Sequence, residues 1–197
     1  GELFDTLRRL QLWDGPVLFG EPIAHKNGEA KRPLTDREMQ RVRAQAYHWL
    51  VPCRRPLVVA LAEAGGTAPE IAAVQLEHLD LDNGVVHFTG KAARTNRIPP
   101  EAHEALCRAL DEGAAVGQRI TVTDALDANK AARSVTQELS EVIRDAGLAR
   151  VPCVAGASIR LHHALRHFHD GGIGDAVRFL GAISVDTTDR KSTRLNS

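Results

Sequence analysis

Apolar residues first recur at helical spacing shortly after residue 30. The positions on one face of this predicted helix are Met39, Val42, Ala46 and either Trp49 or Leu50. The segment before it reads Pro-Leu-Thr-Asp-Arg-Glu. Thr35 and Glu38 form the pattern of a capping box, in which each side chain accepts a hydrogen bond from the other residue's backbone amide. The pattern therefore predicts a sharp helix start at this point.

The same period predicts several further helices, separated by glycine. Residues 55–64 are apolar on most sides, which is typical of a core helix, and Gly65-Gly66 ends it. Thr67 and Glu70 then repeat the capping box and begin a helix whose apolar positions are Ile71, Val74 and Leu76. The remaining helices are expected over 101–112, 130–146, 157–170 and 175–180.

A short β-hairpin interrupts the helical pattern. Residues 85–89 are β-branched and aromatic at strand spacing, Gly90-Lys91 turns the chain, and residues 96–98 return until Pro99-Pro100 stops them. Residues 119–123 are either a short strand or a connector. The predicted fold class is mainly α with a small antiparallel β-hairpin or sheet, an α+β domain.

Composition places the chain among globular proteins and changes this interpretation little. It has 197 residues, 43% hydrophobic and 25% charged, and no apolar run long enough to cross a membrane. The three cysteines are widely spaced, which argues against a disulfide framework and fits a reducing cytoplasm. The 25 basic and 25 acidic residues cancel, so any affinity for nucleic acid must come from local clusters. One basic run comprises Lys31, Arg32, Arg37, Arg41 and Arg43.

Several short motifs occur in an order that resembles the catalytic domain of the tyrosine recombinases, the phage integrase family. The resemblance covers roughly residues 33–190. It is carried by Pro-Leu-Thr-Asp-Arg-Glu at 33–38, Gly-Gly-Thr-Ala-Pro-Glu-Ile at 65–71, Leu-Glu-His-Leu-Asp-Leu-Asp at 76–82, Gly-Lys at 90–91, Arg-Ile-Pro-Pro at 97–100 and Leu-Gly at 180–181. Each motif is weak alone, and the order and spacing carry the argument.

The resemblance implies a specific chemistry. In the family a tyrosine attacks a DNA phosphodiester and forms a 3′-phosphotyrosyl bond. Two arginines stabilise charge on the phosphoryl oxygens, a hairpin lysine protonates the leaving oxygen and histidines assist. No metal and no other cofactor is expected. The expected partner is double-stranded DNA, with self-association on it and no membrane, in a bacterial or phage-like cytoplasm beside the nucleoid.

Lys91 matches the hairpin lysine, whereas the second arginine can be placed in two registers. The spacing to Gly171 and to Leu180-Gly181 favours Arg160 as the arginine, with Ala157 at the preceding histidine position. The alternative takes His163 and Arg166 from the sequence His-Ala-Leu-Arg-His, which copies the family motif but shortens the later spacing. The residues expected to contact DNA are Arg94, Arg97, His163, Arg166 and His167.

Four family positions are substituted. The first arginine is Thr67, the histidine before Arg160 is Ala157, the later histidine is Ala182, and the tyrosine is Lys191. Threonine cannot supply a bidentate cation, and lysine cannot form the phosphotyrosyl ester. We therefore expect a degenerate active site.

The residues around Lys191 offer a second interpretation. The codons for residues 189–197 can be written so that they match a common sequencing adapter, so we interpret 189–197 as a non-native tail and expect a truncation before the tyrosine. The remaining organisation is an N-terminal segment or linker over 1–32, interpreted as the remnant of a core-binding domain, and an integrase-like catalytic domain over 33–188.

Two alternatives to an active recombinase remain open at this point. One is a DNA-binding or assembly module of the same fold that does not cleave. The other is a metal-dependent hydrolase, because His163 and His167 stand one helical turn apart, although the glutamate of a His-Glu-x-x-His motif is missing.

Overall fold

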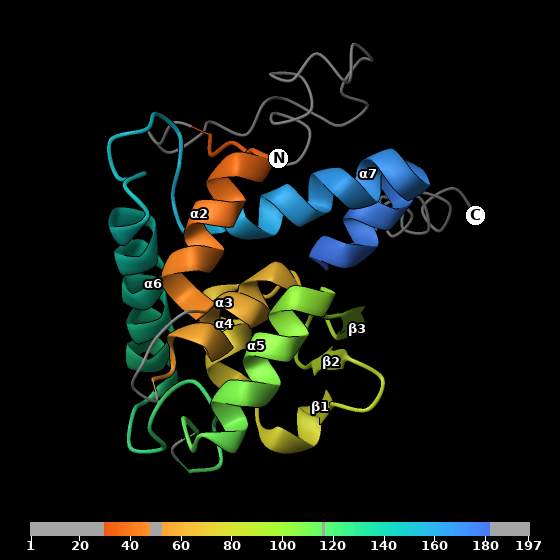
Figure 1. Cartoon of the computed structure of the whole chain (residues 1–197). Helices are drawn as coiled ribbons and strands as arrows, with labels where there is room; N and C mark the ends of the chain where they lie inside the picture. The colour runs from red at the N-terminus through yellow and green to blue at the C-terminus, as the bar shows by residue number, and fades with distance from the viewer. Residues whose placement is uncertain (1–29, 48–52, 116, 182–197) are drawn as a thin grey trace, which may run out of the picture.

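A computed structural model describes residues 30–47, 53–115 and 117–181 of the chain (Figure 1). The α-helices in these ranges are α2 (Asp36–Tyr47), α3 (Arg55–Glu63), α4 (Ala68–Ala73), α5 (Pro100–Asp111), α6 (Ala128–Asp145) and α7 (Ala157–Leu180). The strands are β1 (Leu79–Asp80), β2 (Val85–Phe88) and β3 (Arg94–Arg97). The predicted class, mainly helical with a small antiparallel sheet, is confirmed.

The sheet has three strands rather than the two of the predicted hairpin. Its order is β1-β2-β3, and both pairings are antiparallel. In the hairpin Val85 pairs with Arg97 and Phe88 with Arg94, so the returning strand begins two residues earlier than expected. The additional strand β1 is only two residues long, too short for an alternating pattern to reveal it. Residues 119–123 form no strand; Arg119 makes an isolated bridge to Gln75.

Both predicted capping boxes are confirmed, and they fix where two helices begin. At the start of α2 the Thr35 amide donates to Glu38 Oε2 at 2.8 Å, and the Glu38 amide donates to Thr35 Oγ1 at 3.3 Å. At the start of α4 the Thr67 amide and hydroxyl both donate to Glu70 Oε2 at 2.8 Å. These bonds satisfy amides that have no partner inside the helix.

The helix begun by Thr67 is shorter than its apolar pattern predicts. It ends at Ala73, Val74 is extended and buried, and Leu76 starts a short 3-10 helix (Leu76–His78) with 51% of its surface exposed. The prediction that Leu76 lines the buried face of α4 was therefore wrong. Val74 accepts a hydrogen bond from the Ile120 amide at 3.2 Å, and this contact with a distant loop replaces the next helical bond.

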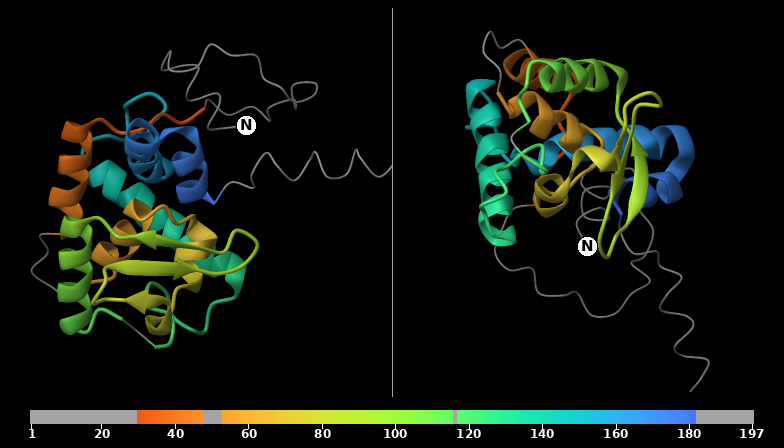
Figure 2. Two further views of the ribbon diagram at one scale, coloured as in Figure 1. Left: turned by 90° about the vertical axis from the view of Figure 1, so that its right-hand side faces the viewer. Right: turned by 90° about the horizontal axis from the view of Figure 1, so that it is seen from below.

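Helix α3 lies at the centre of the molecule. Each of its nine residues is buried, as the run of apolar residues between Arg55 and Glu63 predicts, and these two charged residues at its ends are buried with it. The sheet lies on one side of α3 and α4, and α6 lies on the other (Figures 1 and 2). Arg55 at the start of α3 joins it to α6, donating to Glu138 Oε1 at 2.7 Å and to Asp145 Oδ2 at 2.8 Å.

Helix α7 crosses one end of the molecule and then folds back on itself (Figure 1). Gly172 has a φ of 75° and is not helical, so the segment consists of two helices across a kink, as the Gly171-Gly172 pair predicted. Within the described ranges, no helix is both long and apolar enough to cross a membrane. The predictions for Trp49, Leu50, Ala182 and Lys191, and for the proposed tail 189–197, concern positions outside the described residues.

Candidate functional site

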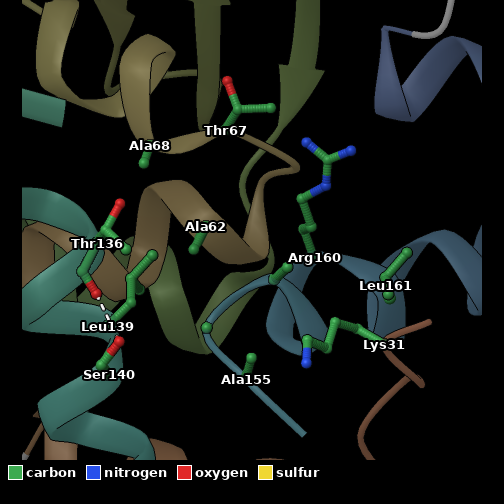
Figure 3. Close-up of a pocket in the computed structure, with 13 residues that line it drawn as sticks. Lys31, Ala62, Thr67, Ala68, Thr136, Leu139, Ser140, Ala155, Arg160 and Leu161 are labelled. Carbon is green, nitrogen blue, oxygen red and sulfur yellow. Dashed lines mark hydrogen bonds between the residues drawn. The ribbon is translucent and has the colours of Figure 1, made fainter. Parts of the chain in front are cut away.

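A cavity of about 420 Å³ opens between α3, α4, α6 and the start of α7 (Figure 3). Its lining is mostly small or apolar, with three hydroxyl side chains and two cations. The lining residues are Lys31, Ala62, Gly66, Thr67, Ala68, Thr136, Leu139, Ser140, Ala155, Gly156, Ala157, Arg160 and Leu161. Three of the predicted family positions meet here, namely Thr67, Ala157 and Arg160, although they are almost one hundred positions apart in sequence.

The described residues that line this cavity include two cations and no carboxylate. Lys31 and Arg160 are its charged residues, and none of the thirteen described residues that line it is acidic. Figure 3 shows the guanidinium of Arg160 extending from α7 toward the side on which Thr67 lies. Such a surface suits an anion, because donors that are already in place need no reorganisation to stabilise negative charge.

The hydroxyl groups on the α6 wall are engaged with their own helix. Ser140 Oγ donates to the Thr136 carbonyl at 2.8 Å, and Thr136 Oγ1 donates to the Ala132 carbonyl at 2.9 Å. Each hydroxyl oxygen still has lone pairs for a further donor, but its proton is committed. The cations therefore dominate what the cavity can bind.

Thr67 stands where the family has its first arginine, and the structure uses it as a cap. Its hydroxyl and amide both donate to Glu70, so the side chain serves the start of α4. Gly66 beside it has no room for a side chain, since an added Cβ would lie 2.7 Å from Ile71 Cγ1 and 2.9 Å from the Phe88 ring. The tight packing of Gly66 holds Thr67 at the edge of the cavity.

Arg94, which the sequence predicted as a DNA contact, is instead part of the internal structure. Its side chain is only 6% exposed. Nε donates to the Phe179 carbonyl at 3.0 Å, Nη1 to Glu70 Oε1 at 2.6 Å and the Ala92 carbonyl at 3.0 Å, and Nη2 to the Gly65 carbonyl at 2.8 Å and Glu70 Oε2 at 3.1 Å. Five donors thus meet five acceptors, and the guanidinium has no N–H left for a phosphate.

These contacts have an electrostatic and a positional consequence. Burial opposes ionisation of Glu70, but the hydrogen bonds from Arg94 and Thr67 together with the Arg94 charge outweigh it and lower the Glu70 pKa. Asn96, two residues further along β3, also donates to the Phe179 carbonyl at 2.8 Å. The side chains of Arg94 and Asn96 thus both donate to a carbonyl in the last turn of α7. Carbonyls in the last turn of a helix have no amide donors within the helix.

His163 was also predicted to contact DNA, and it too is buried. Its Nε2 lies 2.9 Å from Glu63 Oε2, and the residue is 6% exposed. An ionised carboxylate accepts only, so His163 carries a proton on Nε2 and donates it. The imidazole ring therefore makes its hydrogen bond within the protein, because Glu63 on α3 faces α7 at this position.

Glu63 is the centre of a buried cluster that we call the Glu63 cluster, comprising Glu63, Arg43, Tyr47 and His163. Arg43 Nη2 donates to Glu63 Oε2 at 2.6 Å, and the Tyr47 hydroxyl donates to Oε1 at 2.6 Å. Burial opposes ionisation of Glu63, but the bonds from His163 and Arg43 outweigh it and hold its pKa at about 2. Burial and the neighbouring Glu63 charge raise the Tyr47 pKa well above its usual value. Tyr47 is thus a buried packing residue.

The other predicted contacts lie at the surface, outside this cavity. Lys91 is exposed in the β2–β3 turn, Arg97 is exposed at the end of β3, and Arg166 is exposed on α7. His167 stacks on the ring of Phe179 across the α7 kink, with ring centroids 4.4 Å apart, and burial lowers its pKa. In the first register, Arg160 lines one cavity with Thr67. In the alternative register, His163 is buried and Arg166 is exposed, so the two residues are separated.

His163 and His167 do not face a common point, since one bonds to Glu63 and the other stacks on Phe179. Among the residues that the structure describes, no group of three or more His, Cys, Asp or Glu side chains could hold a metal ion.

The arrangement of helices and sheet is that of the tyrosine-recombinase catalytic domain. The chain matches XerA recombinase with a TM-score of 0.63 and 20% identity, over 97% of this chain and 67% of that one. It matches the integrase from mycobacterium phage Brujita with a TM-score of 0.59 and 18% identity, over 96% of this chain and 65% of that one. It matches the Tn1549 transposon integrase, solved in complex with a circular intermediate DNA, with a TM-score of 0.56 and 14% identity, over 86% and 67%.

These likenesses show the fold that the sequence motifs predicted. The chain spans about two thirds of the length of the proteins it matches. No protein-family model matches the chain, and no curated protein matches it.

Sequence reasoning did not assign Lys31, Thr136 and Ser140 to the site. Lys31 is the first residue of a basic run, but the sequence does not show which residue of that run faces a cavity. The structure separates them, because Arg32 pairs with Glu38 and Arg43 pairs with Glu63, whereas Lys31 lines the cavity. Nothing in the sequence distinguished Thr136 and Ser140 from ordinary polar positions on a helix face.

Proposed function

We propose that this chain is a DNA-binding domain of the site-specific recombinase type, which holds a DNA phosphodiester in the 420 Å³ cavity against Arg160. The observation that carries the proposal is that Thr67, Ala157 and Arg160, which the motifs align with family site positions, line one cavity whose described lining has no acidic residue. The Tn1549 integrase structures, which contain DNA, support the same partner. Lys91 and Arg97 would add contacts from the exposed face of the hairpin, and Arg166 from α7.

A non-cleaving role is the second candidate, and the site of Thr67 favours it. A threonine whose hydroxyl is bonded to Glu70 cannot supply the positive charge of an arginine to a transition state. We propose that the domain binds DNA, with self-association on it, and that its capacity for strand cleavage is impaired.

Binding is tested by filter retention of mixed-sequence duplex DNA at two salt concentrations. Each phosphate neutralised adds about 0.9 to the slope of log affinity against log salt. Arg160→Ala should weaken binding, lower this slope by about 1 and reduce affinity more than Arg166→Ala on the same helix, which tests the other register. Salt-independent binding by the wild type would refute the proposal, and an effect confined to Arg166→Ala would refute the register.

Cleavage is tested separately with a suicide substrate, a nicked duplex that traps any covalent protein–DNA adduct. We expect DNA binding without an adduct. Accumulation of a covalent adduct would contradict impairment and would favour an active recombinase.

A further inference from the structure

The second half of α7, residues 173–181, is placed by contacts with other elements rather than by helix continuity. Gly172, with a φ of 75°, interrupts the helix, so the first half of α7 does not dictate the direction of the second. Figure 1 shows the second half folding back toward β3. Its Phe179 and Leu180 pack with Ala164 in a small apolar cluster that is separate from the main core. Because this cluster is small, the position of the segment depends strongly on its polar contacts.

The side chains of Arg94 and Asn96, which we call the β3 bridge, join the end of α7 to the turn between α3 and α4. Arg94 Nε and Asn96 Nδ2 both donate to the Phe179 carbonyl, at 3.0 and 2.8 Å. On the side of the turn, Arg94 Nη2 donates to the Gly65 carbonyl at 2.8 Å. Asn96 Nδ2 also donates to the Ala64 carbonyl at 2.8 Å. The β3 bridge thus holds the end of α7 and the α3–α4 turn in fixed relation to each other.

The turn that the β3 bridge holds leads directly into the cavity. Gly66 and Thr67, which follow Gly65, both line it. The Glu70 carboxylate that accepts from the Thr67 amide and hydroxyl also accepts from Arg94, whose Nη1 lies 2.6 Å from Oε1. Thr67 and the end of α7 are therefore linked through two side chains, Glu70 and Arg94.

Close packing leaves the β3 bridge little freedom to shift. A Cβ added at Gly65 would lie 2.8 Å from Phe179 Cζ, and one added at Gly181 would lie 2.5 Å from Arg94 Nη1. The Phe179 ring also stacks on His167, with the ring centroids 4.4 Å apart. Because such packing has no slack, a displacement of Phe179 moves the bridge, and the α3–α4 turn with it.

We propose that Arg94 is a positioning residue that couples the end of α7 to the edge of the cavity at Thr67. In this role it binds no ligand. It makes the two segments move together, so that an occupant of the cavity changes how firmly residues 173–181 are held. The coupling itself stands on the described contacts. Its response to DNA rests on the proposed function, since DNA is the ligand proposed for the cavity.

The coupling is tested first without DNA, by hydrogen exchange of backbone amides in the full chain followed by mass spectrometry. Leu180→Ala loosens the end of α7 at a buried residue outside the β3 bridge. In the wild-type background it should speed exchange in 173–181 about tenfold or more, and it should also speed exchange in 65–71. In the Arg94→Ala background the effect on 65–71 should disappear. A role for Arg94 in stability alone would leave that effect the same in both backgrounds.

Two further variants serve as the second background and the control. Arg94→Lys keeps the cation but lacks the planar fork that reaches the Phe179 carbonyl, so it keeps the test decisive where Arg94→Ala fails to fold. It should also lose the effect of Leu180→Ala on 65–71. Arg97→Ala, at an exposed position of the same strand, should retain that effect. Exchange in 55–63, the buried helix α3, reports global unfolding of each chain.

Duplex DNA is then added to the same chains at saturating concentration. It should slow exchange in 173–181 about fivefold in the wild type and in Arg97→Ala, and should leave it unchanged in Arg94→Lys. DNA affinity itself should differ little between wild type and Arg94→Lys, because residues 173–181 stay docked in most molecules of each chain.

The outcomes separate the two proposals. If Leu180→Ala leaves exchange in 65–71 unchanged in the wild type, or changes it equally in Arg94→Lys, Arg94 does not couple the two segments. If that effect depends on Arg94 but DNA binding shows no salt dependence, the coupling stands and the DNA function fails. If DNA binding is salt-dependent but slows exchange in 173–181 equally in wild type and Arg94→Lys, or in neither, the function stands and the response of α7 to the ligand fails.

Discussion

The Glu63 cluster and the cavity beside Arg160 are built from the same kinds of cationic and hydroxyl side chains, but only the cluster contains a carboxylate. Around Glu63, an arginine, a tyrosine and a histidine all donate to one buried acid. In the cavity, Lys31 and Arg160 face a space with no acidic residue among its described lining. The first arrangement is complete without a ligand, and the second is the one in which we propose that an anion binds.

This comparison shows why residue type alone does not identify a DNA contact. Arg94 and His163 are of the types that bind phosphate, yet an internal glutamate lies beside each of them. An internal carboxylate at hydrogen-bond distance competes with any external phosphate and needs no association step. The residues for which we propose a binding role are therefore cations that line the cavity or lie at the surface.

The largest expected effect is on the Glu63 cluster. Glu63→Gln removes the charge that balances the buried Arg43, and breaking a buried ion pair costs about 3–5 kcal/mol of unfolding free energy. Urea denaturation would measure it. The control is Glu101→Gln, since Glu101 also pairs with Arg43 but is 69% exposed and should contribute below about 1 kcal/mol. Equal effects of the two variants would show that the cluster is not a closed structural unit.

The pH dependence of stability should report the same cluster. The Glu63 pKa is held at about 2 in the folded protein, below the ordinary 4.5, so its contribution is full above pH 4.5 and is lost as the pH falls toward 2. At about 1.4 kcal/mol per pKa unit, this amounts to about 3 kcal/mol.

Unfolding measured across this pH window in wild type and Glu63→Gln tests the assignment. The Glu38 pKa is also held at about 2, so the wild type alone cannot separate the two acids, and the difference between the two chains isolates Glu63. Parallel pH profiles would refute the role of Glu63.

Arg94 and Arg97 provide a comparison within one strand. Arg94→Ala leaves Glu70 half-buried without its cation and should cost about 2–3 kcal/mol of stability, while the folded fraction keeps its DNA affinity. Arg97→Ala, at an exposed position, should change stability by less than about 0.5 kcal/mol and weaken DNA binding. Denaturation and filter binding on the same samples distinguish these outcomes, and reduced affinity of fully folded Arg94→Ala would contradict the structural role.

The smallest expected effect is at Thr67. Thr67→Ala removes a capping side chain, which costs about 1 kcal/mol, and should leave DNA affinity unchanged because the hydroxyl already bonds to Glu70. Thr35→Ala, at the other capping box, is the matched control and should destabilise by a similar amount. A loss of DNA affinity in Thr67→Ala but not in Thr35→Ala would show that Thr67 contacts the ligand.

Much of the fold is readable from the sequence by local rules. The two capping boxes, the apolar faces of α2 and α6, the glycine breaks and the β2–β3 hairpin all depend on residues close in sequence. The order of the short motifs also predicted the tyrosine-recombinase fold, and the structural likenesses confirm that fold. Strand β1 was missed because two residues are too few to show an alternating pattern. The early end of α4 was missed because a distant partner, the loop at Ile120, decides it.

The roles of individual cations could be assigned only from the tertiary structure. The sequence by itself determined that Lys31, Arg94, Arg160 and His163 are present near family motifs, and that Thr67 replaces an arginine. Only the folded chain decided that Arg94 and His163 meet glutamates from other elements, while Lys31 and Arg160 line a cavity that has no acidic residue among its described lining. The physical reason is that the field at a charged group depends on every charge within a few ångströms, and in this molecule those neighbours come from helices and strands far apart in sequence.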